Sequence, residues 1–206
     1  LFNTEKACEL ALEKILEQLQ PTHALAVFDS QNPCWRYDVY PDYKKGRKKM
    51  PEHLANKLAD IQDRFMNHSV DSLVSETDEA DDLIATLAIK VALRGQNVTV
   101  VSTDKCFLSL LNPNIRVYDY FNRRYLDEEY VLNKFSVKPD KLMDLWTLTG
   151  DNTNKIPGVA GIGQVTASQL LNQYGSIKSI LNATDLKSSI SEKLSQHSEQ
   201  ISLSRQ

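Results

Sequence analysis

Cysteine is scarce in this sequence, and the few cysteines form no pattern. Cys8, Cys34 and Cys106 are odd in number, widely spaced and outside any Cys-x-x-Cys motif. A small domain held together by disulfides needs an even and denser set. The cysteines are instead typical of a reducing compartment, and we expect a cytoplasmic protein.

Long apolar stretches are missing as well. No run approaches the roughly 20 residues that span a bilayer, and no charged segment followed by an apolar one opens the chain. These absences argue against a membrane-spanning or secreted protein. The chain begins at Leu1 rather than at Met, so we expect that an N-terminal segment has been removed.

An excess of basic residues is also lacking. Lys and Arg number 24 against 27 Asp and Glu, which gives a net charge of −3. A protein coated in basic surface is therefore disfavoured, and binding to nucleic acid has to come from local patches. Material for a core is ample, because 41% of the 206 residues are apolar and 25% are charged, a balance that excludes wholesale disorder.

Short apolar runs of strand length alternate with segments of helical periodicity. The strands are predicted at 23–28, 70–75, 97–101 and 115–118. The helices are predicted at 4–19 with Asn3 or Thr4 as N-cap, from Pro51 to about residue 65, at 78–94, in a short segment after Asp104, and after Asp127. This alternation indicates an α/β fold with a mostly parallel central sheet flanked by helices.

The character of the chain changes near residue 136. From Pro139 onward, helices and tight glycine turns replace the alternation. Residues 188–206 read as one amphipathic helix whose partner lies beyond the end of the chain. We therefore predict an α/β core over residues 1–136 and a helical region over residues 137–206.

Five carboxylates crowd the predicted start of the 78–94 helix, within the stretch ETDEADD at 76–82. One or two acids here would only cap the helix and offset its dipole. Three of them, Glu79, Asp81 and Asp82, directly precede an apolar run and repel one another unless a cation lies between them. An all-oxygen cluster suits a hard divalent ion such as Mg²⁺ or Mn²⁺. On this stretch alone, a helix cap and a metal site are equally good interpretations.

Two further acids favour the metal site. Asp29 follows the strand at 23–28, and Asp104 lies three residues beyond the strand at 97–101. Ligands of open α/β sheets bind at the carboxyl ends of parallel strands, so we expect these acids and the start of the 78–94 helix at one edge. Five carboxylates meeting there without a metal would repel one another strongly.

A basic and aromatic segment runs from Trp35 to Lys49. Residues 36–49 hold six basic residues and two acids, a local net charge of +4 in an acidic protein. Such a run is often only a solvated loop, but interleaved rings (Trp35, Tyr37, Tyr40 and Tyr43) are costly to leave in water. Cations for phosphates beside rings for stacking are what single-stranded nucleic acid needs, and we interpret the segment in this way.

Three glycines punctuate the stretch KIPGVAGIG at 155–163, which a helix follows from about Gln164. Glycine lets backbone amides approach an anion at a helix N-terminus, although ordinary turns use glycine too. A helix–turn–helix that also carries Pro157 is more specific, because it resembles hairpins that hold a DNA backbone without reading bases.

Taken together and in this order, these elements resemble the 5′-nuclease superfamily of bacterial 5′→3′ exonuclease domains and flap endonucleases. The likeness is closest to its small bacterial exonuclease IX group. The matching stretches are VFD at 27–29, YKKGRKKMP at 43–51, EADDLIATLA at 79–88, VVSTDK at 100–105 and IPGVAGIG at 156–163. They span roughly residues 4–205, and the acidic and glycine motifs are specific only in combination.

The resemblance implies roles for individual residues. It places a divalent metal, Mg²⁺ or Mn²⁺, on Asp29, Glu79, Asp81, Asp82, Asp104 and Asp151, directly or through water, with Asp81 and Asp82 also counted as catalytic. It implies that Lys44 and Arg47 contact the scissile phosphate. It implies that a helix-three-turn-helix binds duplex DNA beside a K⁺ ion held by the backbone carbonyls of Leu148, Thr149, Pro157, Val159 and Ile162. The DNA contacts implied by the resemblance and the patches are Arg36, Tyr43, Lys44, Arg47, Gly161, Ile162, Gly163, Gln164, Val165 and Thr166.

Three departures from the family pattern concern the metals. The family's first strand, which carries another metal-binding Asp, is not in the sequence, and we expect that it has been lost ahead of Leu1. Cys106 and Asn154 stand where most members carry Asp. A second metal site would keep only Asp104 and Asp151 as carboxylates, because a cysteine is a poor ligand for Mg²⁺.

We therefore predict a Mg²⁺-dependent nuclease that cleaves DNA at 5′ flaps, a monomer with a replication or repair polymerase as a possible partner. The alternative is a non-catalytic protein that binds branched DNA and uses the depleted metal site only for structure. An RNA-cleaving nuclease with a related core is a third reading, which accounts for the acids but not for the glycine hairpin.

Overall fold

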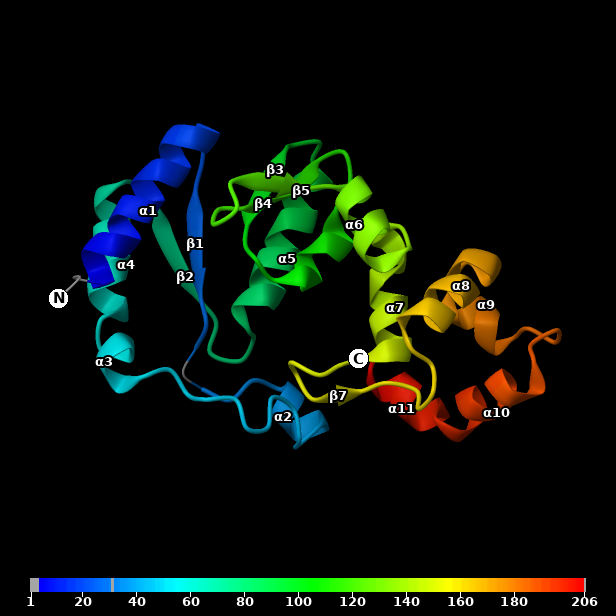
Figure 1. Cartoon of the computed structure of the whole chain (residues 1–206). Helices are drawn as coiled ribbons and strands as arrows, with labels where there is room; N and C mark the ends of the chain where they lie inside the picture. Colours follow the sequence, from blue (N-terminus) through cyan, green and yellow to red (C-terminus); the bar gives the residue numbers. More distant parts are fainter. Residues whose placement is uncertain (1–3, 31, 206) are drawn as a thin grey trace. The chain divides into compact units, whose positions relative to one another are not determined.

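The computed structural model describes residues 4–30 and 32–205, so Leu1 and the predicted cap Asn3 lie outside the described residues. Contacts divide the chain into two units (Figure 1). The first comprises Leu1–Val39 and Gly46–Thr86, and the second comprises Tyr40–Lys45 and Leu87–Gln206.

The first unit builds a parallel strand pair beside two packed helices. Strands β1 (Leu25–Phe28) and β2 (Asp71–Val74) pair in parallel, with Val27 opposite Leu73. The helices are α1 (Thr4–Leu19), α2 (Arg36–Val39), α3 (Glu52–Ala55), α4 (Leu58–Asn67) and the start of α5 (Ala80–Ala92). Phe65 of α4 packs on Phe28 of β1, with ring centroids 6.1 Å apart. The apolar face of α4 therefore covers the strand pair.

Ion pairs join α1 to α4. Glu5 pairs with Lys57, and Glu9 Oε2 accepts a 2.6 Å hydrogen bond from Arg64 Nη1. His68 Nε2 lies 3.3 Å from Glu9 Oε1. The hydrogen bond from Lys57 lowers the pKa of Glu5, and the hydrogen bonds from Arg64 and His68 lower the pKa of Glu9.

The second unit begins with a three-stranded sheet. Strand β3 (Val98–Val101) pairs in parallel with β4 (Ile115–Asp119), and β4 pairs antiparallel with β5 (Arg124–Leu126). The 3₁₀ helix η1 (Lys105–Leu110) follows β3, and α6 (Glu128–Phe135) follows β5. Val117 and Val131 are fully buried, so α6 and the sheet share a core.

Helices make up most of the rest of the second unit. They are η2 (Pro139–Lys141), α7 (Leu142–Thr149), α8 (Gln164–Tyr174), α9 (Ile177–Leu181), α10 (Ser188–Gln196) and α11 (Ser198–Leu203). Two residues each from β6 (Gly150–Asp151) and β7 (Ile156–Pro157) form an antiparallel pair between α7 and α8. The side chains of Leu148, Ala167 and Ile177 are fully buried.

The α/β class is confirmed, and β1–β2 and β3–β4 pair in parallel as predicted. The strands form small separate hydrogen-bonded sheets rather than one continuous central sheet. Strand β5 was not predicted, and the helix expected from Pro51 is broken between α3 and α4. No helix among the described residues is long and apolar enough to cross a membrane.

The prediction for the C-terminal stretch was wrong in one respect. Residues 188–206 do not form one helix with a missing partner, because His197 separates α10 from α11. Leu194 and Ile201, one on each helix, are 2% and 3% exposed. Their apolar face is thus covered within the described chain.

Candidate functional site

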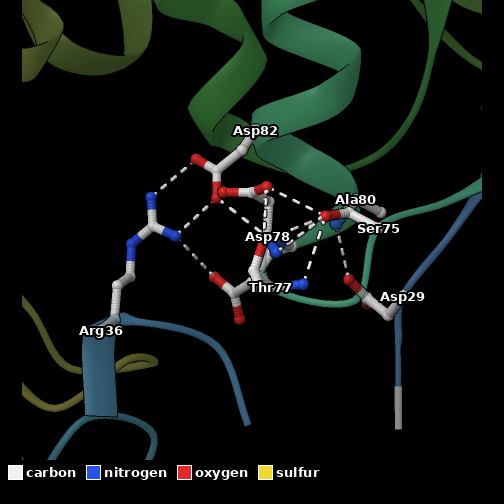
Figure 2. A network of polar contacts seen from close by, with 8 residues as sticks. Asp29, Arg36, Ser75, Thr77, Asp78, Ala80 and Asp82 are labelled. Carbon is white, nitrogen blue, oxygen red and sulfur yellow. Dashed lines mark hydrogen bonds and ion pairs between the residues drawn. The ribbon is translucent and has the colours of Figure 1, made fainter. Parts of the chain in front are cut away.

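The acids of the first unit gather where β1 ends and α5 begins (Figure 2). The Oδ1 atom of Asp29 accepts a 2.8 Å hydrogen bond from the backbone N–H of Ala80, the first residue of α5. This bond satisfies one of the N–H groups that a helix start leaves without an intrahelical partner. It also places the Asp29 carboxylate at the positive end of the helix dipole.

Arg36 joins this cluster. Its guanidinium group donates two hydrogen bonds to Asp82, of 2.6 and 2.7 Å, and lies 3.4 Å from Glu79 Oε2. The guanidinium also stacks over the ring of Trp35, 4.6 Å from its centroid. The repulsion among the acids, which led us to expect a cation between them, is thus offset in part by a side chain of the protein itself.

Asp78 belongs to the loop before α5. Its Oδ2 accepts hydrogen bonds from Ser75 Oγ at 2.9 Å and from Thr77 Oγ1 at 3.0 Å, and the Asp78 N–H donates to Ser75 Oγ. These contacts fix the turn into the helix (Figure 2). Asp81 lies on the first turn of α5 and is half-buried. Of the acidic run, the structure therefore gives Asp78 a purely local role.

In the second unit, Asp104 caps the helix that follows β3. Its Oδ1 accepts a 2.9 Å hydrogen bond from the N–H of Cys106, and its own N–H donates to Ser102 Oγ at 3.0 Å. The carboxylate is exposed, as a metal ligand at the edge of a sheet needs to be. One oxygen is used by the cap, and the second makes no hydrogen bond that we observe.

Asp151 is held from three directions. Lys105 Nζ lies 3.1 Å from its Oδ1, which also accepts from the N–H of Thr153, and Asn154 Nδ2 donates to its Oδ2 at 2.9 Å. The Lys105 ammonium lies over the ring of Trp146, 5.6 Å from its centroid. A lysine thus supplies positive charge to one of the two carboxylates predicted for the second metal, and Asn154 makes a neutral contact with that carboxylate.

The short segment 40–45 contacts the loop that precedes the glycine turn. The N–H of Lys44 donates to the Asn154 carbonyl at 2.9 Å, and Tyr40 Oη donates to the Lys155 carbonyl at 3.2 Å. Tyr43 is only 5% exposed, so packing rather than base stacking accounts for burying its ring. Lys44 has a φ of 52°, and its ammonium lies 5.1 Å from the Tyr43 ring centroid. Arg47 and Lys48 are exposed in the first unit.

Glycine is required where β6 and β7 approach each other. A Cβ atom on Gly158 would lie 2.2 Å from the backbone carbon of Thr149, and one on Gly150 would lie 2.3 Å from the nitrogen of Gly158. The N–H of Val159 donates to the Leu148 carbonyl at 2.8 Å. The chain therefore returns within van der Waals contact of the end of α7.

The predicted K⁺ ligands lie around this approach. The carbonyls of Leu148, Val159 and Pro157 accept hydrogen bonds from the N–H groups of Val159 and Ile162 and from Gln200 Nε2, respectively. Each carbonyl oxygen has two lone pairs, so one remains for a cation. The potassium site stays a prediction.

Helix α8 starts directly after the turn without a side-chain cap. Gly163 is its N-cap residue, and the N–H of Ala167 is bonded to the Gly163 carbonyl at 2.9 Å. The N–H groups of Gln164, Val165 and Thr166 precede this bond and form the first turn, where no intrahelical acceptor exists. The side chain of Val165 is 71% exposed. These amides are therefore suited to an anion.

Sequence reasoning missed three residues that contact the turn from the C-terminal helices. They are Lys193, His197 and Gln200, and Gln200 donates to the carbonyls of both Pro157 and Gly158. Lys193 lies on α10, His197 lies at the break between the helices and Gln200 lies on α11. The sequence reads this stretch as one amphipathic helix, so it predicted neither the break nor the contacts with the turn.

Two family models together match residues 5–206. The model described as "5'-3' exonuclease, N-terminal resolvase-like domain" matches residues 5–136, and "5'-3' exonuclease, C-terminal SAM fold" matches residues 137–206. The chain belongs to the 5′-3′ exonuclease family. Family membership rests on both models, so it applies to the acidic motifs and to the glycine turn alike.

Curated members of the 5′-3′ exonuclease family are close in sequence. The chain is 71% identical over 205 residues to "Flap endonuclease Xni" of Colwellia psychrerythraea, covering 100% of this chain and 71% of the relative. It is 46% identical over 205 residues to the protein of the same name from Photobacterium profundum, covering 98% and 80%.

Solved structures of low sequence identity share the fold. "T5 5'-EXONUCLEASE" superimposes with a TM-score of 0.84 at 17% identity, over 99% of this chain and 80% of that one. The catalytic core of Rad2 in complex with DNA substrate gives a TM-score of 0.57 at 16% identity, over 96% and 65%. At these identities the likeness shows the fold alone.

Proposed function

We propose that this member of the 5′-3′ exonuclease family is a flap endonuclease that hydrolyses DNA phosphodiesters near the junction of a 5′ flap. The observation that carries the proposal is the carboxylate cluster at the start of α5, in a chain 71% identical to a protein named as a flap endonuclease. In this proposal the protein acts on DNA in the cytoplasm and works as a monomer. A replication or repair polymerase is the partner that we propose to test.

The acids are suited to a divalent metal by their chemistry. All proposed ligands offer carboxylate oxygens, the donors that Mg²⁺ and Mn²⁺ prefer, and Asp29 uses only its Oδ1 at the helix start. When bound, the ion lowers the pKa of a water molecule and polarises the phosphate. The ligands in this proposal are Asp29, Glu79, Asp81, Asp82, Asp104 and Asp151.

Cations of the protein hold the phosphate in this proposal. Lys44 and Arg47 neutralise negative charge on the scissile group, and the exposed basic residues 45–49 attract the strand. The hydrogen bond from the Lys44 N–H to the Asn154 carbonyl fixes the left-handed backbone of Lys44. It therefore fixes the position of the Lys44 Cα, from which the side chain extends. In this proposal Arg36 orients Asp82, to which it is bound, and also contacts DNA.

Duplex DNA is held without base reading. The amides of Gly161 and of Gly163 to Thr166 bind phosphates at the start of α8, whereas the Ile162 N–H donates to the Val159 carbonyl. A K⁺ ion on the carbonyls near Gly158 links the turn to the same strand. Phosphate contacts of this kind depend on the shape of the substrate and not on its sequence. Cleavage position is then set by where the duplex ends.

Cleavage of a labelled 5′-flap duplex tests the proposal. Asp81→Ala is expected to abolish cutting in Mg²⁺ while leaving binding of the flap nearly unchanged, and EDTA to abolish cutting by the unaltered protein. Glu76→Ala removes an equal charge from the same acidic run, where the side chain is exposed and outside the ligand set, and is expected to cut normally. Retained turnover in Asp81→Ala contradicts the assignment.

The same assay separates the alternatives. Tight flap binding without cutting in Mg²⁺ or Mn²⁺ would point to a branched-DNA-binding protein, and the departures at Cys106 and Asn154 would explain it. Preferential cutting of an RNA flap would point to an RNA nuclease. The close relatives favour the catalytic reading over the non-catalytic one.

A further inference from the structure

The carbonyls of the glycine turn face a row of side chains from the C-terminal helices. Gln200 Nε2 donates to the Pro157 carbonyl at 2.8 Å and to the Gly158 carbonyl at 2.6 Å. Lys193 Nζ donates to the Gly161 carbonyl at 3.1 Å. Two side chains thus satisfy three carbonyls of a five-residue stretch, and Figure 1 shows α11 beside β7.

His197 completes the row. Its Nδ1 lies 2.8 Å from the Lys193 carbonyl, which can only accept, so Nδ1 carries the proton. Nε2 is then an acceptor, and the N–H of Ala160 lies 3.5 Å from it, a long contact. Lys193 on α10, His197 between the helices and Gln200 on α11 thus all contact the backbone of the same turn.

The helices that carry this row are anchored. Leu194 and Ile201, each one position beyond a member of the row, are 2% and 3% exposed. Burial of these side chains fixes the rotation of both helices about their axes. The donors are therefore presented to the turn in a set direction rather than as mobile surface groups.

The hydrogen bonds to the turn also constrain the start of α8. The peptide unit between Gly161 and Ile162 is planar, and it is fixed at both ends: its oxygen by Lys193 and its N–H by the Val159 carbonyl at 3.0 Å. Gly163, the N-cap of α8, follows directly. The backbone is thus held as far as Ile162, the residue before the N-cap of α8. This hold determines the direction in which the amides of the first turn of α8 point.

We propose that Lys193, His197 and Gln200 form a clamp that positions the glycine turn for binding duplex phosphates. The clamp residues do not contact the reacting atoms; they act through the backbone of residues 157–163. The inference rests on the proposed function, and it adds to it residues of the C-terminal helices that determine DNA affinity.

Gln200→Glu tests the clamp at nearly constant volume. The variant replaces the donor by a carboxylate that repels the carbonyls of Pro157 and Gly158. If Gln200 served only in packing, KM would therefore not change. We expect KM for a flap duplex to rise about tenfold or more, with kcat at saturating DNA within about twofold of the unaltered protein. Gln200→Ala is expected to lie between the two.

Gln196 supplies the matched control, because it is the same residue type on α10, exposed, and outside the row. Gln196→Glu adds an equal negative charge and is expected to leave KM within about twofold. Lys193→Arg, which keeps a cationic donor, is expected to retain affinity that Lys193→Met loses. Equal KM values for the Gln200 and Gln196 variants overturn the clamp, and so does a parallel loss of kcat and thermal stability.

Hydrogen exchange separates failure of the clamp from failure of the proposed function. The amides of Val159 and Ile162 are expected to exchange faster in Gln200→Ala than in Gln196→Ala, without DNA present. If the unaltered protein neither binds nor cuts flaps, the proposed function fails, and exchange still decides whether the row holds the turn. Equal exchange in the two variants rejects the clamp whatever the DNA assays give.

Discussion

The guanidinium group of Arg36 binds the carboxylate of Asp82 in a bidentate pair, with N–O distances of 2.6 and 2.7 Å. The same group lies 3.4 Å from Glu79. A cation of the protein therefore offsets part of the negative charge on two of the acids proposed to bind a divalent metal. Arg36 and a metal ion would compete for the carboxylates of Glu79 and Asp82, and this competition can be measured.

Removing the Arg36 charge is expected to strengthen metal binding. In Arg36→Met, the carboxylates of Glu79 and Asp82 repel one another without a counter-ion, so the metal-free protein is less stable and a bound ion stabilises it more. The rise in Tm caused by saturating Mg²⁺ should be larger in the variant than in the unaltered protein. Lys48→Met, an exposed charge in the same unit, is the control. An equal rise in both variants contradicts the prediction.

Lys105 is expected to weaken metal binding at Asp151 in the same way. In Lys105→Met, Asp151 loses the ammonium 3.1 Å away and becomes available to a second ion. Calorimetric titration with Mn²⁺ should show a Kd about tenfold lower for the weaker of two ions, or a second binding site that the unaltered protein lacks. Lys141→Met removes a lysine that pairs with the exposed Asp140 and should titrate like the unaltered protein. Unchanged binding in Lys105→Met would show that Asp151 is not a ligand.

The ion pairs of α1 predict how stability depends on pH. Contacts with Arg64 and His68 hold the pKa of Glu9 below its ordinary value of 4.5, so the folded state keeps Glu9 ionised where the unfolded chain is already protonated. This contribution is complete above about pH 4.5 and is lost as the pH falls through the lowered pKa. Glu9→Gln should therefore lower Tm by a few degrees at pH 7, and the difference should vanish in acid. Glu17→Gln, an exposed acid of the same helix, should show no such dependence.

Gly158→Ala is expected to disrupt the turn. Its Cβ would lie 2.2 Å from backbone atoms of Thr149, which cannot move as a flexible side chain would. We expect a loss of roughly 2–4 kcal/mol in the free energy of unfolding, together with lost DNA binding. Gly163→Ala meets nothing within 4 Å and should cost about 1 kcal/mol or less. Denaturant unfolding of both variants checks this, and similar losses would refute it.

Local signals made much of the fold predictable. Helix α1 and strand β3 follow from periodicity and lie where the sequence places them, and α6 begins after Asp127 as predicted. Strand β5 was missed because three residues carry too little alternation, and its order depends on pairing with β4. The break between α3 and α4 falls at Asn56, a residue of low helix propensity.

The candidate site was predictable in its acids and less so in its partners. Asp29 was expected at a strand end near the start of a helix, and its bond to Ala80 joins those two elements. Arg36 was assigned to DNA because it stands in a basic run, whereas the structure pairs it with Asp82, 46 residues away. Sequence gives a charge but not which distant charge it meets. The same holds for Gln200, whose acceptors are backbone atoms that carry no sequence signal.

The bond from the Ala80 N–H to Asp29 makes the beginning of α5 sensitive to what the carboxylate binds. An ion that draws electron density from Asp29 weakens this acceptor, and the amide proton of Ala80 then shifts and exchanges faster. A single backbone resonance thus reports occupancy of the acidic cluster in a protein with every side chain intact. Metal affinity becomes measurable by titration without a substrate, a variant or a turnover.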